Sequence, residues 1–123
     1  MLLVPVIVKP SSIHGNGVFA VEAIPIRTPV WCFTPGFDLD LDPSLLEAQP
    51  PHFRERMLHY GYLDPRLKRY ILCCDDARFI NHSDAPNLAV DYSADRYGID
   101  YAARDIGAGE ELTIDYGLVE GRR

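Results

Sequence analysis

The chain has 123 residues, of which 47% are hydrophobic and 24% are charged, and its formal net charge is -6 at pH 7. These values are typical of an ordinary soluble globular domain and exclude a disordered or membrane-embedded chain. The acidic balance argues against direct nucleic-acid binding, which requires a basic stripe, and it is compatible with a cationic partner such as a lysine-rich peptide.

Short strands make up most of the predicted secondary structure. Strands are predicted at residues 4–9, 18–21, 30–33, 37–42, 70–74, 87–92, 97–103 and 112–116. In the fourth of these, apolar residues alternate with aspartates, which predicts a half-exposed strand with Asp38, Asp40 and Asp42 on its solvent face. The sixth and seventh are expected to form a hairpin about residues 93–96.

Helical signals occur only in the middle of the sequence. Asp42-Pro43 predicts the start of a short helix around Leu45-Leu46, and a second helix is predicted over residues 51–60, ended by Gly61. The apolar stripe of the second helix, which is expected to pack in the core, consists of Phe53, Met57 and Tyr60. The pattern as a whole predicts a mainly β, folded-over architecture with one or two short helices.

The cysteine pattern favours reduced thiols. Three cysteines are an odd number, and Cys73 and Cys74 are neighbours whose side chains point to opposite faces of a strand, so a disulfide framework is not expected. The cysteines and histidines do not form the closely spaced ligand pairs that zinc binds. We therefore expect no metal site.

Gly15-Asn16-Gly17 follows the first predicted strand and, together with Ala20, matches a dinucleotide-binding fingerprint. That fingerprint requires a helix next, but β-branched and aromatic residues follow, and Pro25 and Pro29 would break a helix within about two turns. A nucleotide-binding oxidoreductase is therefore a weak alternative. The glycines are better explained by backbone that turns tightly or approaches a ligand closely.

Three motifs occur in an order that indicates a family. They are HGNGVFA at residues 14–20, RFINHSDAPN at residues 78–87 and GEELTIDYG at residues 109–117. Taken alone, the second motif could be a well-capped polar turn, because its Asn, His, Ser and Asp side chains can bond nearby backbone. With all three motifs present, the sequence resembles the SET-domain lysine methyltransferases.

The resemblance implies one SET domain over residues 1–123, with the β-clip fold of several short strands in small sheets and with residues 36–70 as the variable insert. In that family the C-terminal segment threads beneath the Asn-His loop in a knot-like arrangement. Asp84 stands where members with a cysteine-rich tail carry a zinc-binding cysteine, and no such tail follows. The chain therefore resembles the minimal SET domains of viruses and bacteria.

The resemblance also implies a site. Tyr116 is expected to be the catalytic tyrosine at the end of a lysine channel. The residues expected to bind S-adenosylmethionine are Gly15, Asn16, Gly17, Arg78, Asn81 through its amide, His82 mainly through its backbone, and Tyr116. The residues expected to line the channel are Tyr62, Tyr70 and Ile114. Judged from their positions alone, Tyr116 could be a tyrosine packed at a strand end and His82 an ordinary surface histidine.

The activity that the resemblance implies is methyl transfer from S-adenosylmethionine to the side-chain amine of a lysine in a protein or peptide. A free lysine has a pKa of about 10.4, so presenting its neutral amine near pH 7.4 costs roughly 4 kcal/mol unless burial lowers that pKa. The phenol of Tyr116, with an ordinary pKa of about 10, is expected to orient the amine rather than to remove its proton. A non-catalytic SET-like module that binds peptide is the alternative.

We expect a cytoplasmic protein without membrane association, or one inside a host cell if it is viral or leaves its cell by a non-classical route, since the sequence carries neither a membrane span nor a signal peptide. No aromatic residue follows Tyr116 to cover the channel. We expect a homodimer in which a neighbouring chain covers it, favoured by the apolar Leu118 and Val119. The alternative is a monomer whose substrate completes the wall.

Overall fold

Small sheets carry the β structure of this protein. The computed structural model describes residues 1–119, and their side chains up to Gly117. Within these residues four sheets form: β1 (Val6–Pro10) with β2 (Asn16–Ala20); β3 (Pro29–Trp31) with β9 (Ile99–Ala102) and β8 (Leu88–Asp91); β4 (Leu39–Leu41) with β6 (Arg69–Leu72) and β5 (Tyr62–Asp64); and β7 (Asn81–His82) with β10 (Thr113–Ile114). The helices are α1 (Pro43–Glu47), α2 (Pro51–Tyr60), the 3-10 helix η1 (Asp76–Phe79) and α3 (Tyr116–Val119). The mainly β prediction is confirmed.

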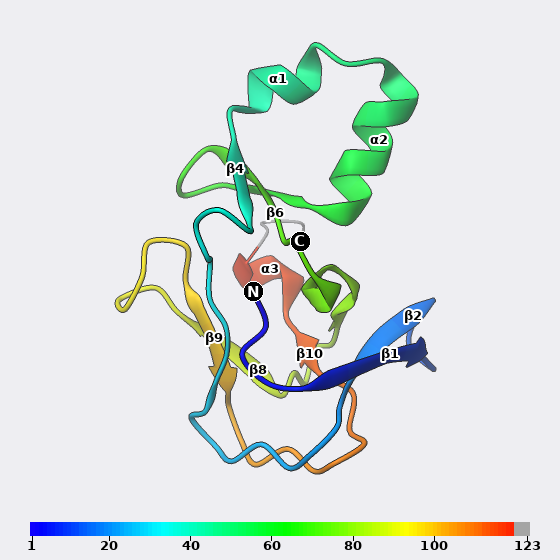
Figure 1. Ribbon diagram of the computed structural model, residues 1–123, viewed down its shortest axis with the longest axis vertical. Coiled ribbons are helices and arrows are strands. Elements are labelled where there is room, and N and C mark those ends of the chain that lie inside the picture. The colour runs from blue at the N-terminus through cyan, green and yellow to red at the C-terminus, as the bar shows by residue number, and fades with distance from the viewer. Residues whose placement is uncertain (120–123) are drawn as a thin grey trace.

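The core lies where the β1–β2 hairpin meets the β3–β9–β8 sheet and the C-terminal segment. Its buried members are Val18, Ala20, Ile24, Val30, Ile80, Leu88, Ala102, Ile106, Leu112 and Ile114. Strands β8 and β9 pair antiparallel from Leu88 opposite Ala102 to Asp91 opposite Ile99, which confirms the predicted hairpin. Figure 1 shows α1 and α2 at the other end of the molecule, beyond the β4–β6–β5 sheet.

The start of α1 and the bounds of α2 agree with the sequence prediction. The Asp42 carboxylate accepts the backbone N–H of Ser44 at 2.9 Å, which caps α1. Helix α2 begins at Pro51 and ends at Tyr60, and the N–H of the following Gly61 donates to the backbone oxygen of Met57 at 2.9 Å. These ends were predictable because each depends on residues within one turn of it.

The prediction that the apolar stripe of α2 packs in the core is wrong. No residue of α2 is buried, and Phe53 keeps 44% of its surface exposed. The helix packs mainly against α1 and β5, which are themselves small, so Met57 and Tyr60 are only half-buried. The end of α2 instead borders two cavities, described below, through His59 and Tyr60.

The alternation expected along β4 is inverted at its start. Asp38, predicted on the solvent face, is 4% exposed, and its carboxylate accepts the backbone N–H of Thr34 at 2.7 Å and of Cys74 at 2.9 Å. Phe37 and Leu39 are exposed instead, at 63% and 46%. Charge-assisted bonds from backbone donors are roughly twice as strong as neutral ones, and here they bring the carboxylate inward.

The C-terminal segment lies beside the Asn81-His82 loop, because β10 pairs in parallel with β7. The strand predicted over residues 112–116 is shorter than expected, since β10 ends before Asp115 and Tyr116 opens α3. The Asp115 carboxylate accepts the N–H of Gly117 at 2.9 Å. A local bond of this kind offers the backbone an alternative to the sheet ladder and turns the chain out of the strand.

The cysteines, the helix lengths and the C-terminal residues each bear on a prediction made from the sequence. The cysteines are free thiols, as predicted, with Cys73 buried and Cys74 exposed. No helix within residues 1–119 is long and apolar enough to cross a membrane. The side chains of Leu118 and Val119 lie outside the described part of the chain, so the homodimer stays a prediction.

Candidate functional site

A buried amide joins three segments that are far apart in the sequence. Asn81, at the start of β7, is 7% exposed. Its Nδ2 donates to the backbone oxygens of His14 at 3.0 Å and Asn16 at 3.2 Å, and to Oε2 of Glu111 at 2.9 Å. Because a buried amide is stabilised only when its donors find acceptors, Asn81 holds the turn between β1 and β2 against β7.

Two glycines of this turn have different roles. A side chain on Gly17 would collide with the carboxylate of Glu111, which also accepts a hydrogen bond from Ser11 Oγ at 2.7 Å. Gly17 is therefore needed for close packing. Gly15 has a φ of +47° and no atom within 4 Å of the place that a Cβ would take, so it makes the left-handed turn and borders open space.

The first of two cavities, here called the turn cavity, lies beside this turn. It is lined by His14, Gly15, Asn16, His59, Tyr60, Arg78, Phe79, Asn81 and Tyr116. Its wall thus combines a guanidinium, polar groups of a tight turn and aromatic rings. Such a wall suits a ligand that carries both an anionic group and a flat ring.

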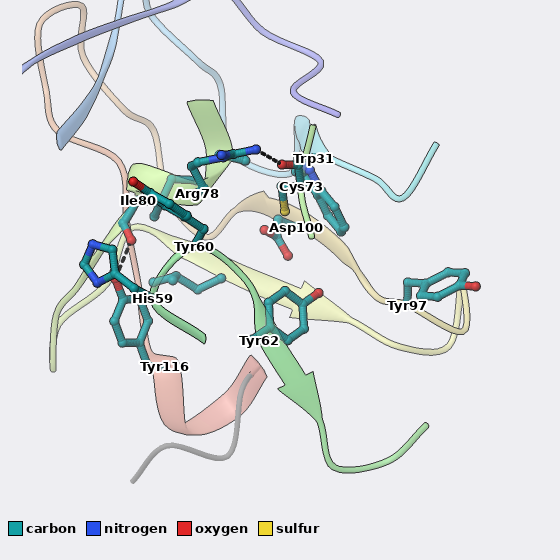
Figure 2. Close-up of a pocket in the computed structure, with 12 residues that line it drawn as sticks. Trp31, His59, Tyr60, Tyr62, Cys73, Arg78, Ile80, Tyr97, Asp100 and Tyr116 are labelled. Carbon is teal, nitrogen blue, oxygen red and sulfur yellow. Dashed lines mark hydrogen bonds between the residues drawn. The ribbon is translucent and has the colours of Figure 1, made fainter. Parts of the chain in front are cut away.

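The second cavity, here called the aromatic cavity, adjoins the first and shares four lining residues with it: His59, Tyr60, Arg78 and Tyr116. Its other lining residues are Trp31, Tyr62, Cys73, Ala77, Ile80, Tyr97, Asp100 and Ile114. Figure 2 shows the side chains around this cavity, with aromatic rings from β3, β5, the segment between β8 and β9, the end of α2 and the start of α3. Such a space can hold the apolar stem of a long side chain.

Tyr116 lies on the wall common to both cavities. Its hydroxyl donates to the backbone oxygen of Ile80 at 2.6 Å, a bond drawn in Figure 2. Its backbone N–H donates to Nδ1 of His82 at 3.1 Å, and the two rings lie 5.4 Å apart between centroids. Tyr116 is therefore held both at its backbone and at its hydroxyl, at the place where a group in one cavity can meet a group in the other.

Comparison with known families identifies this arrangement. The family model of the SET domain matches residues 15–117, which include Gly15, Asn81 and Tyr116. The chain belongs to the SET-domain family. None of the curated proteins matches this SET-domain chain in sequence.

The SET-domain fold of the chain is similar to several solved structures. One is an inferred histone methyltransferase of Plasmodium falciparum, with a TM-score of 0.64 and 22% identity over 94% of this chain and 96% of that one. Another is a humanized mutant of the Chaetomium thermophilum Polycomb Repressive Complex 2 bound to the inhibitor GSK126, with a TM-score of 0.65 and 24% identity over 95% of this chain and 15% of that one. A third is that complex in an autoinhibited conformation bound to S-adenosylmethionine, with a TM-score of 0.66 and 24% identity over 94% of this chain and 15% of that one. At these identities the likeness establishes the fold.

Most residues that the SET-domain resemblance assigned to the cofactor lie on the turn cavity. These are Gly15, Asn16, Arg78, Asn81 and Tyr116. The other two support the cavity from behind, since Gly17 packs against Glu111 and the ring of His82 bonds Tyr116. Nε2 of His82 lies 2.9 Å from Oδ1 of Asp84, so the ring side chain is engaged on both of its nitrogens.

The residues expected to form the lysine channel are divided between two places. Tyr62 and Ile114 line the aromatic cavity. Tyr70 is 1% exposed, its hydroxyl donates to the backbone oxygen of Met57 in α2, and burial raises its pKa to about 12. The structure therefore does not bring Tyr70 to the cavity wall, because its ring anchors α2 to β6.

Sequence reasoning missed much of the aromatic cavity. The missed lining residues include Trp31, His59, Tyr60, Tyr97 and Asp100. Asp100 alone carries a signal in the sequence, because it is a charged residue in a predicted strand whose neighbours on the same face, Gly98 and Ala102, are small and uncharged. The other four come from segments that only the tertiary structure brings together.

Proposed function

We propose that this SET-domain protein transfers a methyl group from S-adenosylmethionine to the side-chain amine of a lysine in a protein substrate. The observation that supports this proposal most directly is the position of Tyr116 between the turn cavity and the aromatic cavity. A methyl donor in one cavity and an amine in the other would meet at its phenol. The similar Polycomb complex that contains S-adenosylmethionine supports the choice of donor.

The turn cavity fits S-adenosylmethionine in its chemistry. The guanidinium of Arg78 suits the carboxylate of the methionine part, and the rings of Tyr60 and Phe79 suit the flat adenine. The empty space beside Gly15 leaves room for a ligand to approach the backbone of the turn. When bound, S-adenosylmethionine supplies a methyl group on a positively charged sulfur, which is a good leaving group.

Tyr116 would orient the acceptor amine. Its O–H is donated to the backbone oxygen of Ile80, so its oxygen meets an incoming amine as a hydrogen-bond acceptor. An amine that donates one N–H to this oxygen is held with its lone pair directed elsewhere, as an in-line displacement requires. The phenol therefore contributes orientation and electrostatic stabilisation while it stays neutral.

The part of the aromatic cavity beside Tyr116 would keep the amine unprotonated. Tyr60, Tyr62 and Ile114 present mostly apolar surface beside Tyr116. Burial in such surroundings disfavours the ammonium form and lowers the pKa of a lysine, which offsets the roughly 4 kcal/mol that deprotonation costs at neutral pH. Exclusion of water also strengthens the hydrogen bond that Tyr116 makes.

Incubation of the protein with methyl-labelled S-adenosylmethionine and a host-cell lysate, followed by mass spectrometry, tests this function. We expect label on lysine side chains, loss of most label with Tyr116→Phe, and no loss with Tyr101→Phe, a control on the next strand position to Asp100 and thus on the opposite face of β9. Calorimetry is expected to show one cofactor site that Asn81→Ala weakens. Cofactor or peptide binding without any label transfer would contradict the enzyme and favour a non-catalytic binding module.

A further inference from the structure

The central strand of the β3–β9–β8 sheet carries a half-buried aspartate that borders the aromatic cavity. Asp100 of β9 lies opposite Trp31 of β3 and opposite Val90 of β8. Its neighbours on the same face of the strand, Gly98 and Ala102, are both buried. Aspartate is disfavoured in strands and is rarely buried without a partner, so its presence here requires an explanation.

The carboxyl of Asp100 borders the aromatic cavity, and within residues 1–119 it forms no ion pair. The Met1 ammonium acts on it through space but is bonded to the Asp38 carboxylate at 2.8 Å. Figure 2 draws its side chain between Cys73 and Tyr62. Burial raises the pKa of Asp100 to about 7. An unpaired carboxylate in such a place is costly, and a cation that entered the cavity would remove much of that cost.

A second polar group of the same cavity also lacks a partner. Nε1 of Trp31 is buried without a hydrogen bond in the described part of the chain, and Trp31 is only 3% exposed. Buried polar groups are nearly always bonded, so an unbonded indole N–H on β3, opposite the half-buried carboxyl of Asp100 on β9, marks a place that a ligand can complete. The observation is independent of the charge on Asp100.

The rest of the cavity wall suits a cation with an apolar stem. Aromatic rings attract ammonium groups that approach their faces, and Trp31 and Tyr62 line the cavity beside Asp100. The rings of Tyr60 and Tyr97 also line it, but arginines already lie over them. Arg78, the arginine on the wall, donates one N–H to the backbone oxygen of Cys73 at 2.9 Å, and within residues 1–119 it forms no ion pair with Asp100. It therefore leaves the Asp100 carboxyl open to a mobile cation.

We propose that Asp100 and the aromatic side chains around it bind an alkylammonium ion, and that in the enzyme this ion is the side chain of the substrate lysine on its way to Tyr116. The carboxylate accepts an N–H, so the site selects an ammonium that still carries one and discriminates against a quaternary ammonium. The cation site stands on the contacts of this cavity. Its identification with a substrate lysine rests on the proposed methyl transfer.

Trp31 is the only tryptophan of the sequence, so its fluorescence reports on the cavity directly. Wild-type protein without cofactor is titrated with n-butylammonium, with n-butyltrimethylammonium and with the neutral 1-butanol, at constant ionic strength and about pH 8, where the carboxyl is ionised. We expect a saturable change with n-butylammonium and binding of the other two that is weaker by roughly tenfold, because each lacks either the charge or the N–H. Equal binding of all three, or no saturable change, would overturn the proposal.

The site is located by comparing n-butylammonium binding in two variants, each of which lacks one negative charge. Asp100→Asn keeps the size of the side chain and is expected to weaken n-butylammonium binding by roughly tenfold or more, whereas Glu22→Gln, at an exposed position outside the cavity, should leave it unchanged. Circular dichroism checks that both variants fold. Wild-type affinity in folded Asp100→Asn protein would overturn the site even if methyl transfer is found.

Whether the occupant is the substrate lysine is tested separately, in the active enzyme, with a lysine peptide that the enzyme methylates. Asp100→Asn is expected to raise the KM for the peptide by roughly tenfold and to change kcat less, because binding of the ammonium is lost while Tyr116 is untouched. An unchanged KM, beside an intact n-butylammonium site in the wild type, would overturn the substrate lysine as the occupant. A protein without methyl transfer would leave the fluorescence result unaffected.

Discussion

The backbone N–H of Tyr116 donates to Nδ1 of His82 at 3.1 Å, across 34 residues of sequence. A ring nitrogen that accepts carries no proton, so the neutral ring has its proton on Nε2, which lies 2.9 Å from Oδ1 of Asp84. This bond fixes the residue that opens α3 and, through it, the phenol that stands between the two cavities. The imidazole thus positions Tyr116 without itself lining either cavity.

Replacing His82 by alanine is expected to misplace Tyr116. Methyl transfer should fall by about tenfold or more, because small displacements of a positioning group cost large factors in rate. Cofactor affinity, measured by calorimetry, should change less, since the expected cofactor contact of His82 is made by its backbone. The control Asp84→Asn, whose side chain is 79% exposed, should stay near the wild-type rate. A wild-type rate in His82→Ala would contradict the positioning role.

Tyr116→Phe removes the hydroxyl and its bond to Ile80 while it keeps the ring. We expect methyl transfer to fall by an order of magnitude or more, because orientation of the amine is lost. The loss of one neutral hydrogen bond should lower the free energy of unfolding by only about 1 kcal/mol. Rates at saturating cofactor and a thermal melt measure the two effects. An unchanged rate would remove the phenol from the mechanism.

Gly17→Ala and Gly107→Ala form a matched pair that tests the turn. A Cβ at Gly17 collides with the Glu111 carboxylate, whereas one at Gly107 meets Glu110 at the ordinary contact distance of 3.4 Å. Gly17→Ala should therefore push Glu111 away from Asn81, weaken cofactor binding by roughly tenfold and lower stability by about 1–3 kcal/mol. Gly107→Ala should have little effect on either. Equal cofactor affinities in calorimetry would show that the Glu111–Asn81 contact does not shape the site.

The stability of the protein is expected to depend on Asp100 in mildly acidic solution. Burial raises the pKa of Asp100 from its ordinary value of 3.8 to about 7. Between these values the folded protein holds a proton that the unfolded chain releases, so stability decreases as the pH rises and levels off above about 7. The full difference corresponds to roughly 4 kcal/mol.

Denaturant unfolding of the wild type and of Asp100→Asn over this pH range measures the effect. The variant should become more stable relative to the wild type as the pH rises from about 4 to 7, because its amide never ionises. Other titratable and charged groups face Asp100, and their own contributions to the pH dependence of stability are present in both proteins and cancel when the variant is compared with the wild type. These groups are the Met1 ammonium, His59, Tyr60, Tyr62, Cys73, Arg78, Tyr92 and Tyr97. A pH-independent difference would mean that Asp100 is ionised or paired throughout.

Ile114 lines the aromatic cavity two residues before Tyr116, and its side chain carries no hydroxyl to restrict the space beside the amine. We expect the wild type to add more than one methyl group to a lysine. Ile114→Tyr should limit the product to fewer methyl groups, because the phenol fills space that a methylated amine would need. Mass spectrometry of a lysine peptide after the reaction measures how many methyl groups each protein adds. A single methyl in the wild type would contradict the prediction.

Part of the fold could be predicted because it depends on short-range chemistry. The Asp42 cap, the Pro51 start and the Gly61 end of the two middle helices, and the β8–β9 hairpin, all follow from interactions among residues close in the sequence. The three motifs likewise led to the SET-domain family, which the match over residues 15–117 confirms. Two of these motifs contribute the residues that Asn81 joins.

What the sequence by itself determined, then, is the type and position of most elements and the family to which the chain belongs. Only the tertiary structure decided that Asp38 turns inward, that Tyr116 opens a helix, and that Asp100 stands opposite Trp31 on a cavity wall. The physical reason is the distance along the chain over which the deciding contacts act. Asn81 and its acceptor at His14 are 67 residues apart, and Leu2 and the carboxylate of Asp75 that accepts its N–H are 73 apart. Local propensities depend on neighbouring residues and hold no information about a partner that only folding brings within about 3 Å.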